Sequence, residues 1–135
     1  MITSTITAEF EADLQTVWDI VVDLEHYAWR SDLSKLVVKD ETHFTEYAKS
    51  GFPTEFTITK KEPCREYCFD MRNHNMTGKW IGLFSATASG GTQIVFTEEL
   101  EIKNQAMKLL AKFVKPFHKM QLSYVEDLRK TLRQR

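Results

Sequence analysis

Residues 104–133 read NQAMKLLAKFVKPFHKMQLSYVEDLRKTLR, and large side chains recur through them at steps of three and four. Such spacing is typical of one face of an α-helix, and basic residues fill much of the other face. The helix would hold roughly 30 residues and be about 45 Å long at 1.5 Å per residue. The face consists of Ala106, Leu109, Leu110, Phe113, Val114, Phe117, Met120, Gln121, Tyr124, Leu128 and Leu132. It needs a broad partner surface, and we predict that it closes a cavity.

Pro116 interrupts this helical pattern. A proline inside a helix removes one hydrogen bond and clashes with the preceding turn. We therefore predict a kink near Phe113, and the alternative is a separate helix over 103–112.

The chain before this helix reads as seven strands. Residues 2–10 alternate between apolar and polar side chains and are rich in β-branched residues, as in a strand. Six more candidates follow with short turns between them, at 33–39, 43–49, 54–60, 66–72, 77–88 and 92–103. Connections this short allow only antiparallel pairing, because a parallel crossover needs a dozen or more residues.

Between the first two strands the pattern becomes helical. Asp13 is a suitable N-cap, and Leu14, Val17, Trp18, Val21 and Leu24 follow at helical spacing. A second short helical turn is expected over 28–30. The predicted fold class is α+β in the order β-α-α-β6-α, with a seven-stranded curved antiparallel sheet wrapped on the long C-terminal helix, as a single domain over 1–135.

Composition limits the classes of function. The chain has 42% hydrophobic residues, 27% charged residues and a formal net charge of −1, so its bulk charge gives no reason to expect nucleic acid or an anionic membrane as a partner. It shows no signal-peptide pattern and no apolar run of membrane-spanning length. Cys64 and Cys68 have no second pair at zinc spacing. We expect a cytoplasmic protein without integral membrane contact, metal or cofactor, either monomer or homodimer.

Several strands would present aromatic side chains to one face of the sheet. A twisted sheet of seven strands curls, and one helix is too narrow to fill a wide concavity. The residues that share strand faces are Tyr67, Phe69 and Met71; Trp80, Gly82, Phe84 and Ala86; Ile94, Phe96, Glu98 and Leu100; and Phe56 and Ile58. If these faces point inward, they line the cavity together with the terminal helix. A fully packed core is the alternative interpretation.

The order of elements resembles the polyketide cyclase/dehydrase and lipid-transport family of the START-like (SRPBCC) superfamily, which has the helix-grip fold of the birch-pollen allergen. The likeness covers essentially the whole chain and is carried by residues 13–18, 23–29, 78–80 and 91–96. The resemblance implies a ligand site between the sheet and the final helix. It also implies an entrance near Tyr27, Trp29 and residues 50–53.

Few residues are candidates for a catalytic or metal-binding role. Glu98 shares strand parity with Ile94 and Phe96, and Glu46 shares it with Phe44. A carboxylate inside an apolar cavity would have a raised pKa and could act as a general acid or base, whereas a strand glutamate is more commonly on the solvent side. The four histidines stand at no metal-ligand spacing, and no nucleophile elbow, phosphate loop or dinucleotide motif occurs.

Two functions from different classes remain open. The first is binding or carriage of a small hydrophobic or amphipathic molecule or lipid, with Gln121 or Glu98 fixing a polar end. The second is a cyclase/dehydrase-like enzyme that uses Glu98, or Glu46, as general acid/base. A weaker third is a dimeric partner-binding module, suggested by Ile81 and Leu83 on the outer strand face. The predicted ligand-binding residues are Tyr27, Trp29, Phe56, Phe69, Met71, Trp80, Phe84, Phe96, Phe113, Phe117, Met120, Gln121 and Tyr124.

Overall fold

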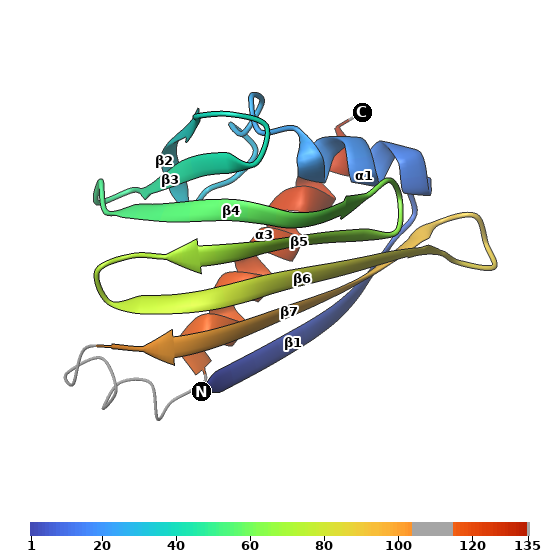
Figure 1. The fold of residues 1–135 in the computed structure, drawn as a ribbon. Helices are drawn as coiled ribbons and strands as arrows, with labels where there is room; N and C mark the ends of the chain where they lie inside the picture. Colours follow the sequence, from blue (N-terminus) through green and yellow to red (C-terminus); the bar gives the residue numbers. More distant parts are fainter. Residues whose placement is uncertain (104–114, 135) are drawn as a thin grey trace.

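The computed structural model describes residues 1–103 and 115–134, apart from the side chains of residues 115–117. Seven antiparallel strands form one curved sheet, and the helix α3 (Lys115–Arg133) runs across one face of it (Figure 1). The spatial order is β1-β7-β6-β5-β4-β3-β2. The strands are β1 (Ile2–Phe10), β2 (Leu33–Val38), β3 (His43–Ala48), β4 (Pro53–Glu62), β5 (Glu66–Arg72), β6 (Met76–Ala86) and β7 (Thr92–Ile102). These confirm the predicted fold class and all seven strands.

The first helix, α1 (Leu14–Val22), begins as predicted. The Asp13 carboxylate accepts a hydrogen bond from the Thr16 N–H at 3.3 Å and one from the Thr16 hydroxyl at 2.6 Å. These bonds satisfy a free end of the helix and lower the pKa of Asp13. Trp18 points from α1 to the sheet and meets Phe84 edge-on at 4.9 Å between ring centroids.

The expected second helix is a turn. The Asp23 carboxylate accepts hydrogen bonds from the N–H groups of Glu25 and His26, at 3.0 and 3.2 Å, just after α1 ends. A single backbone bond then joins the Arg30 N–H to the Tyr27 carbonyl at 3.0 Å. Residues 23–32 therefore form an irregular connection, and this connection places Arg30 and Asp32 beside the sheet.

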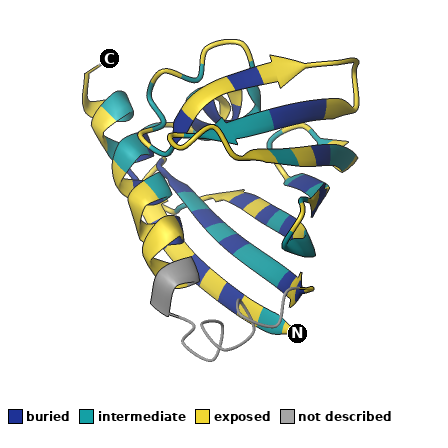
Figure 2. Cartoon of the chain, turned by 90° about the vertical axis from the view of Figure 1, so that its left-hand side faces the viewer, coloured by how far each residue is buried: buried dark blue, intermediate teal, exposed yellow. Residues whose placement is uncertain are grey.

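Buried and exposed residues alternate along most strands, as a sheet with one covered face requires (Figure 2). In β1 the inward residues are Ser4, Ile6, Ala8 and Phe10. Helix α3 contributes Gln121, Val125 and Leu128 to the interior. The predicted kink near Phe113 and the alternative helix over 103–112 lie outside the described residues.

One buried side-chain pair joins α3 to β1. The Ser4 hydroxyl donates to Gln121 Oε1 at 2.7 Å, and Gln121 Nε2 donates to the Ser4 carbonyl at 2.9 Å. Both polar groups are thus satisfied by each other in the interior. This pair fixes the rotation of α3 about its axis, so that Tyr124 faces the strands β6 and β7.

Candidate functional site

A cavity of about 300 Å³ lies between the sheet, α3 and the connection that leads to β2. Ten of the residues predicted from the sequence line it: Glu46, Phe56, Phe69, Met71, Trp80, Phe96, Glu98, Met120, Gln121 and Tyr124. Phe52 and Met120 line the cavity and yet are 38% and 58% exposed. The cavity therefore opens between α3 and the loop that joins β3 to β4.

Aromatic rings from neighbouring strands form the floor of the cavity. Phe69 and Trp80 are stacked with their centroids 4.8 Å apart, and Trp80 lies 4.8 Å from Phe96. Phe44 stacks on Phe56 at 4.8 Å further along the sheet. The alternation of β3 to β7 brings these rings to one face, where they pack against one another.

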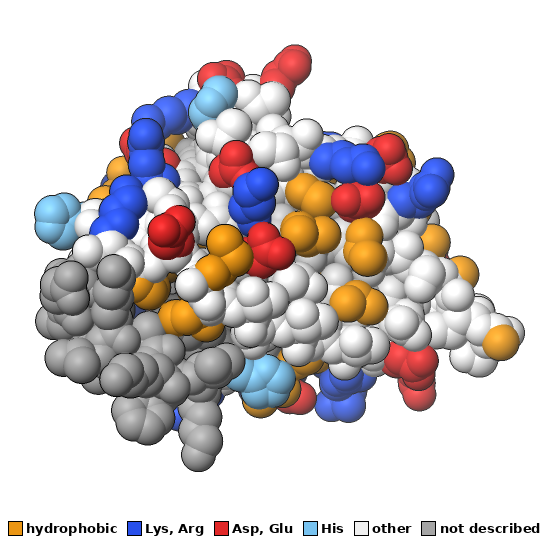
Figure 3. All heavy atoms as spheres, turned by 60° about the horizontal axis from the view of Figure 1, so that its bottom comes forward, with side chains coloured by type: hydrophobic (Ala, Val, Ile, Leu, Met, Phe, Trp, Pro, Cys, Tyr) orange, Lys and Arg blue, Asp and Glu red, His pale blue; other side chains and the backbone are white. Residues whose placement is uncertain are grey.

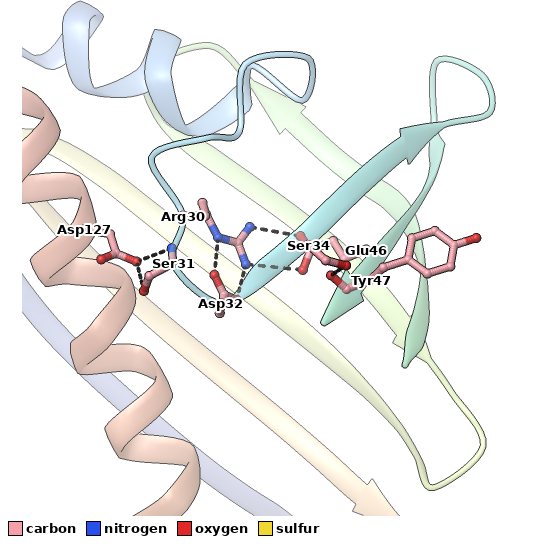
Figure 4. A network of polar contacts seen from close by, with 7 residues as sticks. All are labelled: Arg30, Ser31, Asp32, Ser34, Glu46, Tyr47 and Asp127. Carbon is pink, nitrogen blue, oxygen red and sulfur yellow. Dashed lines mark hydrogen bonds and ion pairs between the residues drawn. The ribbon is translucent and has the colours of Figure 1, made fainter. Parts of the chain in front are cut away.

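The guanidinium group of Arg30 belongs to the lining of this cavity, and with Asp32, Glu46 and Glu98 it forms what we call the polar end. Figure 4 shows the polar contacts of Arg30. Arg30 donates through Nη1 and Nη2 to Glu46, at 3.0 and 3.3 Å, and through Nε and Nη2 to Asp32, at 3.1 and 2.7 Å. Its Cζ lies 5.0 Å from the centre of the Tyr124 ring. Burial disfavours the charge, but the two carboxylates outweigh it and raise the pKa of Arg30.

The loop that carries Arg30 is attached to α3. The Ser31 N–H and hydroxyl both donate to Asp127 Oδ2, at 2.8 Å each. The guanidinium is therefore held in place from the helix side as well as from β3. Arg30 closes the polar end of the cavity as a fixed group.

Glu98 enters the same polar end from β7. It is the cross-strand neighbour of Trp80, and it is partly buried. Burial, and then the negative charge of Glu46, raise the pKa of Glu98 to about 7, and Arg30 offsets part of this rise. No hydrogen bond to the Glu98 carboxyl is found within the described part of the chain. Its carboxyl group is therefore available for a guest molecule or for proton transfer.

Tyr67 is a further polar group that lines the cavity. It is 2% exposed, and its hydroxyl lacks a hydrogen-bond partner among the described residues. Burial raises the pKa of Tyr67, as does the charge of Glu46. A buried hydroxyl without a partner costs free energy, so a ligand that binds this hydroxyl would recover that cost. Gln121, by contrast, already uses both Oε1 and Nε2 of its amide in hydrogen bonds with Ser4.

Five of the predicted ligand residues lie elsewhere or are not described. Phe84 packs under Trp18 of α1, because β6 is long enough to run beneath both helices. Trp29 packs edge-on against Tyr124 with their centroids 5.2 Å apart, and Tyr27 packs on the core; neither lines the cavity. Phe113 and the Phe117 side chain lie outside the described residues. A role in ligand binding stays a prediction for all thirteen residues.

Sequence reasoning did not find Arg30, Asp32 or Tyr67 as polar groups of the site. Tyr67 shares the strand parity of Phe69 and Met71, so parity predicts its inward direction. Parity does not indicate that its hydroxyl group lacks a hydrogen-bond partner in the described structure. Arg30 and Asp32 lie in an irregular connection, where periodicity gives no direction. The signal in the sequence was an arginine two residues before an aspartate, directly after an aromatic stretch.

A wider hollow of about 590 Å³ lies on the opposite face of the sheet. Charged side chains line it, and some of them pair with each other, as Arg72 does with Glu55 at 2.7 Å. Acidic and basic side chains are also interspersed with apolar ones on the face shown in Figure 3. The outer hollow is lined mainly by charged and polar side chains, so the inner cavity is the better candidate for a hydrophobic guest.

Comparison with known proteins identifies the family. The family model described as "Polyketide cyclase / dehydrase and lipid transport" matches residues 1–129. The chain belongs to this family. The resemblance stated from the sequence is therefore confirmed, together with the START-like (SRPBCC) helix-grip fold. A search of curated proteins gives no match.

Solved structures of similar fold include two bacterial proteins of nearly the same length. A conserved protein from Geobacillus kaustophilus has a TM-score of 0.80 at 11% identity and covers 98% of this chain and 96% of its own. Protein MLL2253 from Mesorhizobium loti has a TM-score of 0.78 at 12% identity, with 98% of each chain covered. At such identities the likeness shows the shared fold.

A third similar structure is DynU16, a putative protein in the dynemicin biosynthetic locus. It has a TM-score of 0.73 at 14% identity, and the match covers 97% of this chain and 47% of DynU16.

Within the described part of this family member, neither helix has the length and hydropathy of a membrane span. The described residues also contain no group of three or more His, Cys, Asp or Glu that could hold a metal ion.

Proposed function

We propose that this member of the polyketide cyclase/dehydrase and lipid-transport family binds a small amphipathic molecule in the cavity between the sheet and α3. The observation that carries the proposal is a cavity of about 300 Å³ with an aromatic floor, in whose lining Arg30, Asp32, Glu46 and Glu98 lie close enough to act on one another. Ligand pockets are of this kind, mostly apolar with a few convergent polar groups, and begin at about 300 Å³. The apolar body of the ligand lies on the floor formed by Phe69, Trp80 and Phe96, and its polar end lies near Glu98 and Tyr67.

The volume supports binding over a purely structural role. Protein interiors are close-packed, and voids larger than a water molecule are few. Here the aromatic rings of the floor are packed against one another, and the cavity opens beside Phe52 and Met120. A ligand of modest size can therefore enter without unfolding the sheet.

The substitution Ala48→Phe is expected to abolish binding of a neutral naphthyl dye, or to weaken it at least about tenfold. Ala48 lines the cavity, so a phenyl ring there occupies the space that the dye needs. Dye fluorescence measures the affinity, and urea denaturation checks that the variant is folded. Leu83→Phe is the matched control, because Leu83 is 45% exposed on the outer face of β6 and adds a ring away from the cavity. Equal dye binding by a folded Ala48→Phe variant would exclude this cavity as the site.

A second candidate function is acid-base catalysis of the cyclase/dehydrase kind. The observation that favours it is Glu98, whose pKa of about 7 lies where a general acid or base works best at neutral pH. Glu46 is less suited, because both of its oxygens accept hydrogen bonds from Arg30.

Glu98→Gln separates the two functions. If the protein is an enzyme of this kind, the variant loses turnover of a polyketide-like substrate by about 100-fold or more while dye binding is kept. If the protein is a carrier, the wild-type protein turns over none of a panel of such substrates, and a ligand purifies with it. Native mass spectrometry of the fresh protein detects that ligand.

A further inference from the structure

The charges at the polar end of the cavity do not balance. One guanidinium, that of Arg30, faces the carboxylates of Asp32 and Glu46, which leaves one net negative charge. Glu98 adds a third carboxyl group to the same place. Among the described residues that line the cavity, Arg30 is the only cationic side chain. Acidic side chains in the lining of the cavity therefore outnumber cationic ones.

Arg30 is also committed to its partners. Four of the five guanidinium N–H groups donate to Asp32 and Glu46. The Tyr124 ring covers the guanidinium at 5.0 Å. A carboxylate on a ligand would consequently meet two or three acidic groups and no free cation, and like charges at such distances repel.

The surroundings of Glu98 are suited to a cation. Trp80 is its neighbour across the β6–β7 pair, Phe96 is on the same face of β7, and the Tyr124 ring lies 5.2 Å from the Phe96 ring. Ammonium groups are attracted to aromatic rings and to carboxylates alike. An acidic group among aromatic rings is the arrangement that recognises alkylammonium ions.

We propose that the ligand of this cavity is an amphiphilic amine, with its protonated amino group against Glu98 and its apolar body on the aromatic floor. This inference rests on the proposed function, since it names the class of molecule that the same cavity takes. The Tyr67 hydroxyl, which lacks a partner in the described structure, offers a further hydrogen bond to the polar part of such a ligand.

Three probes of equal chain length test the class of ligand: octylamine, octanol and octanoate. Each competes with the neutral naphthyl dye for the wild-type protein at pH 7.5. We expect octylamine to displace the dye at a concentration at least about tenfold lower than octanol, and octanoate to be the weakest. Octanol or octanoate binding as tightly as octylamine would overturn the inference, as would dye binding that octylamine cannot reverse.

Matched variants locate the effect. Glu98→Gln keeps the size of the side chain and removes its charge, so the preference for octylamine over octanol should fall about tenfold. Glu99→Gln changes the next residue of β7, which faces the outer hollow, and should leave the preference unchanged. A preference that survives Glu98→Gln intact would show that Glu98 does not bind the amine.

The pH dependence of octylamine binding to the wild-type protein is an independent test of the inference. An alkylamine resembles the lysine side chain, with a pKa of about 10.4, and stays protonated from pH 6 to 8. Glu98 ionises over this range, so octylamine binding should tighten by up to about tenfold between pH 6 and 8 while octanol binding does not. The other titratable and charged groups that line the cavity with Glu98 are Arg30, Asp32, Glu46, Tyr67 and Tyr124, and of these Arg30, Asp32 and Glu46 act directly on its carboxyl group. A flat pH profile for octylamine would contradict the inference.

The two proposals fail in different ways. If the dye does not bind wild-type protein, or binds Ala48→Phe equally well, then the cavity is not a ligand site and both proposals are wrong. If the dye binds and Ala48→Phe removes the binding, but octylamine is not preferred, then only the class of ligand is wrong.

Discussion

Glu98→Gln is expected to stabilise the protein by about 3 kcal/mol at pH 8 and to change its stability little at pH 4. The folded protein holds the pKa of Glu98 at about 7, whereas the ordinary value is 4.5. Because the folded state binds this proton more tightly than the unfolded chain, the ionised carboxylate destabilises the fold. The loss of stability begins as the pH rises through 4.5 and is nearly complete above pH 7, and it amounts to about 1.4 kcal/mol for each pH unit of the shift.

Urea denaturation at several pH values measures this effect. The difference in unfolding free energy between Glu98→Gln and wild type should grow with pH between 4.5 and 7 and then level off. Glu99→Gln serves as the control, since Glu99 lies on the outer face of the same strand. A constant difference from pH 4 to 8 would mean that Glu98 titrates alike in the folded and unfolded states, and that its surroundings are well hydrated.

Arg30→Met is expected to destabilise the protein by about 3–5 kcal/mol at pH 7. Arg30 and Glu46 are both largely buried, with side chains 15% and 14% exposed, and Arg30 is the cation that compensates the acidic groups at the end of the cavity. Removal of one partner of a buried ion pair leaves an uncompensated charge, and losses of this size follow. Methionine preserves much of the side-chain volume, so the effect reports on charge and hydrogen bonding.

A double-mutant cycle separates the pair from its surroundings. Arg30→Met with Glu46→Gln removes both charges, so the double variant should recover a large part of the stability that Arg30→Met loses. A loss below about 1 kcal/mol for Arg30→Met alone would place the pair among solvent-screened surface ion pairs. No recovery in the double variant would assign the loss to packing.

The fold could be predicted from the sequence because its signals are local. The alternation of residues 2–10 predicted the first strand, the short turns predicted six more strands and their antiparallel pairing, and Asp13 marked the start of α1. Parity along β7 also placed Glu98 on the inner face with Phe96. Each of these conclusions depends on residues that are close together in the chain.

The polar end of the site could not be predicted in the same way. Arg30 reaches Glu46 from an irregular connection, and Asp32 in the same connection pairs with Arg30. The carboxylates of Asp23 and Asp127 accept hydrogen bonds from the backbone of this connection and so set its path. Phe84 shows the converse limit. Strand parity predicted correctly that Phe84 lies on the inner face of β6. Parity does not say, however, which helix covers each part of a long strand. The part of β6 that holds Phe84 is covered by Trp18 of α1 and not by α3.

The pairing of β1 with β7 has a consequence for synthesis of the protein on the ribosome. Ile2 lies opposite Leu100, so the first strand meets its neighbour only after about a hundred residues have been made. At about 5–20 residues per second, the backbone N–H and C=O groups of β1 lack their β7 partners for at least several seconds. The nascent chain therefore completes its sheet late, and β1 is the strand that stays unpaired for the longest time.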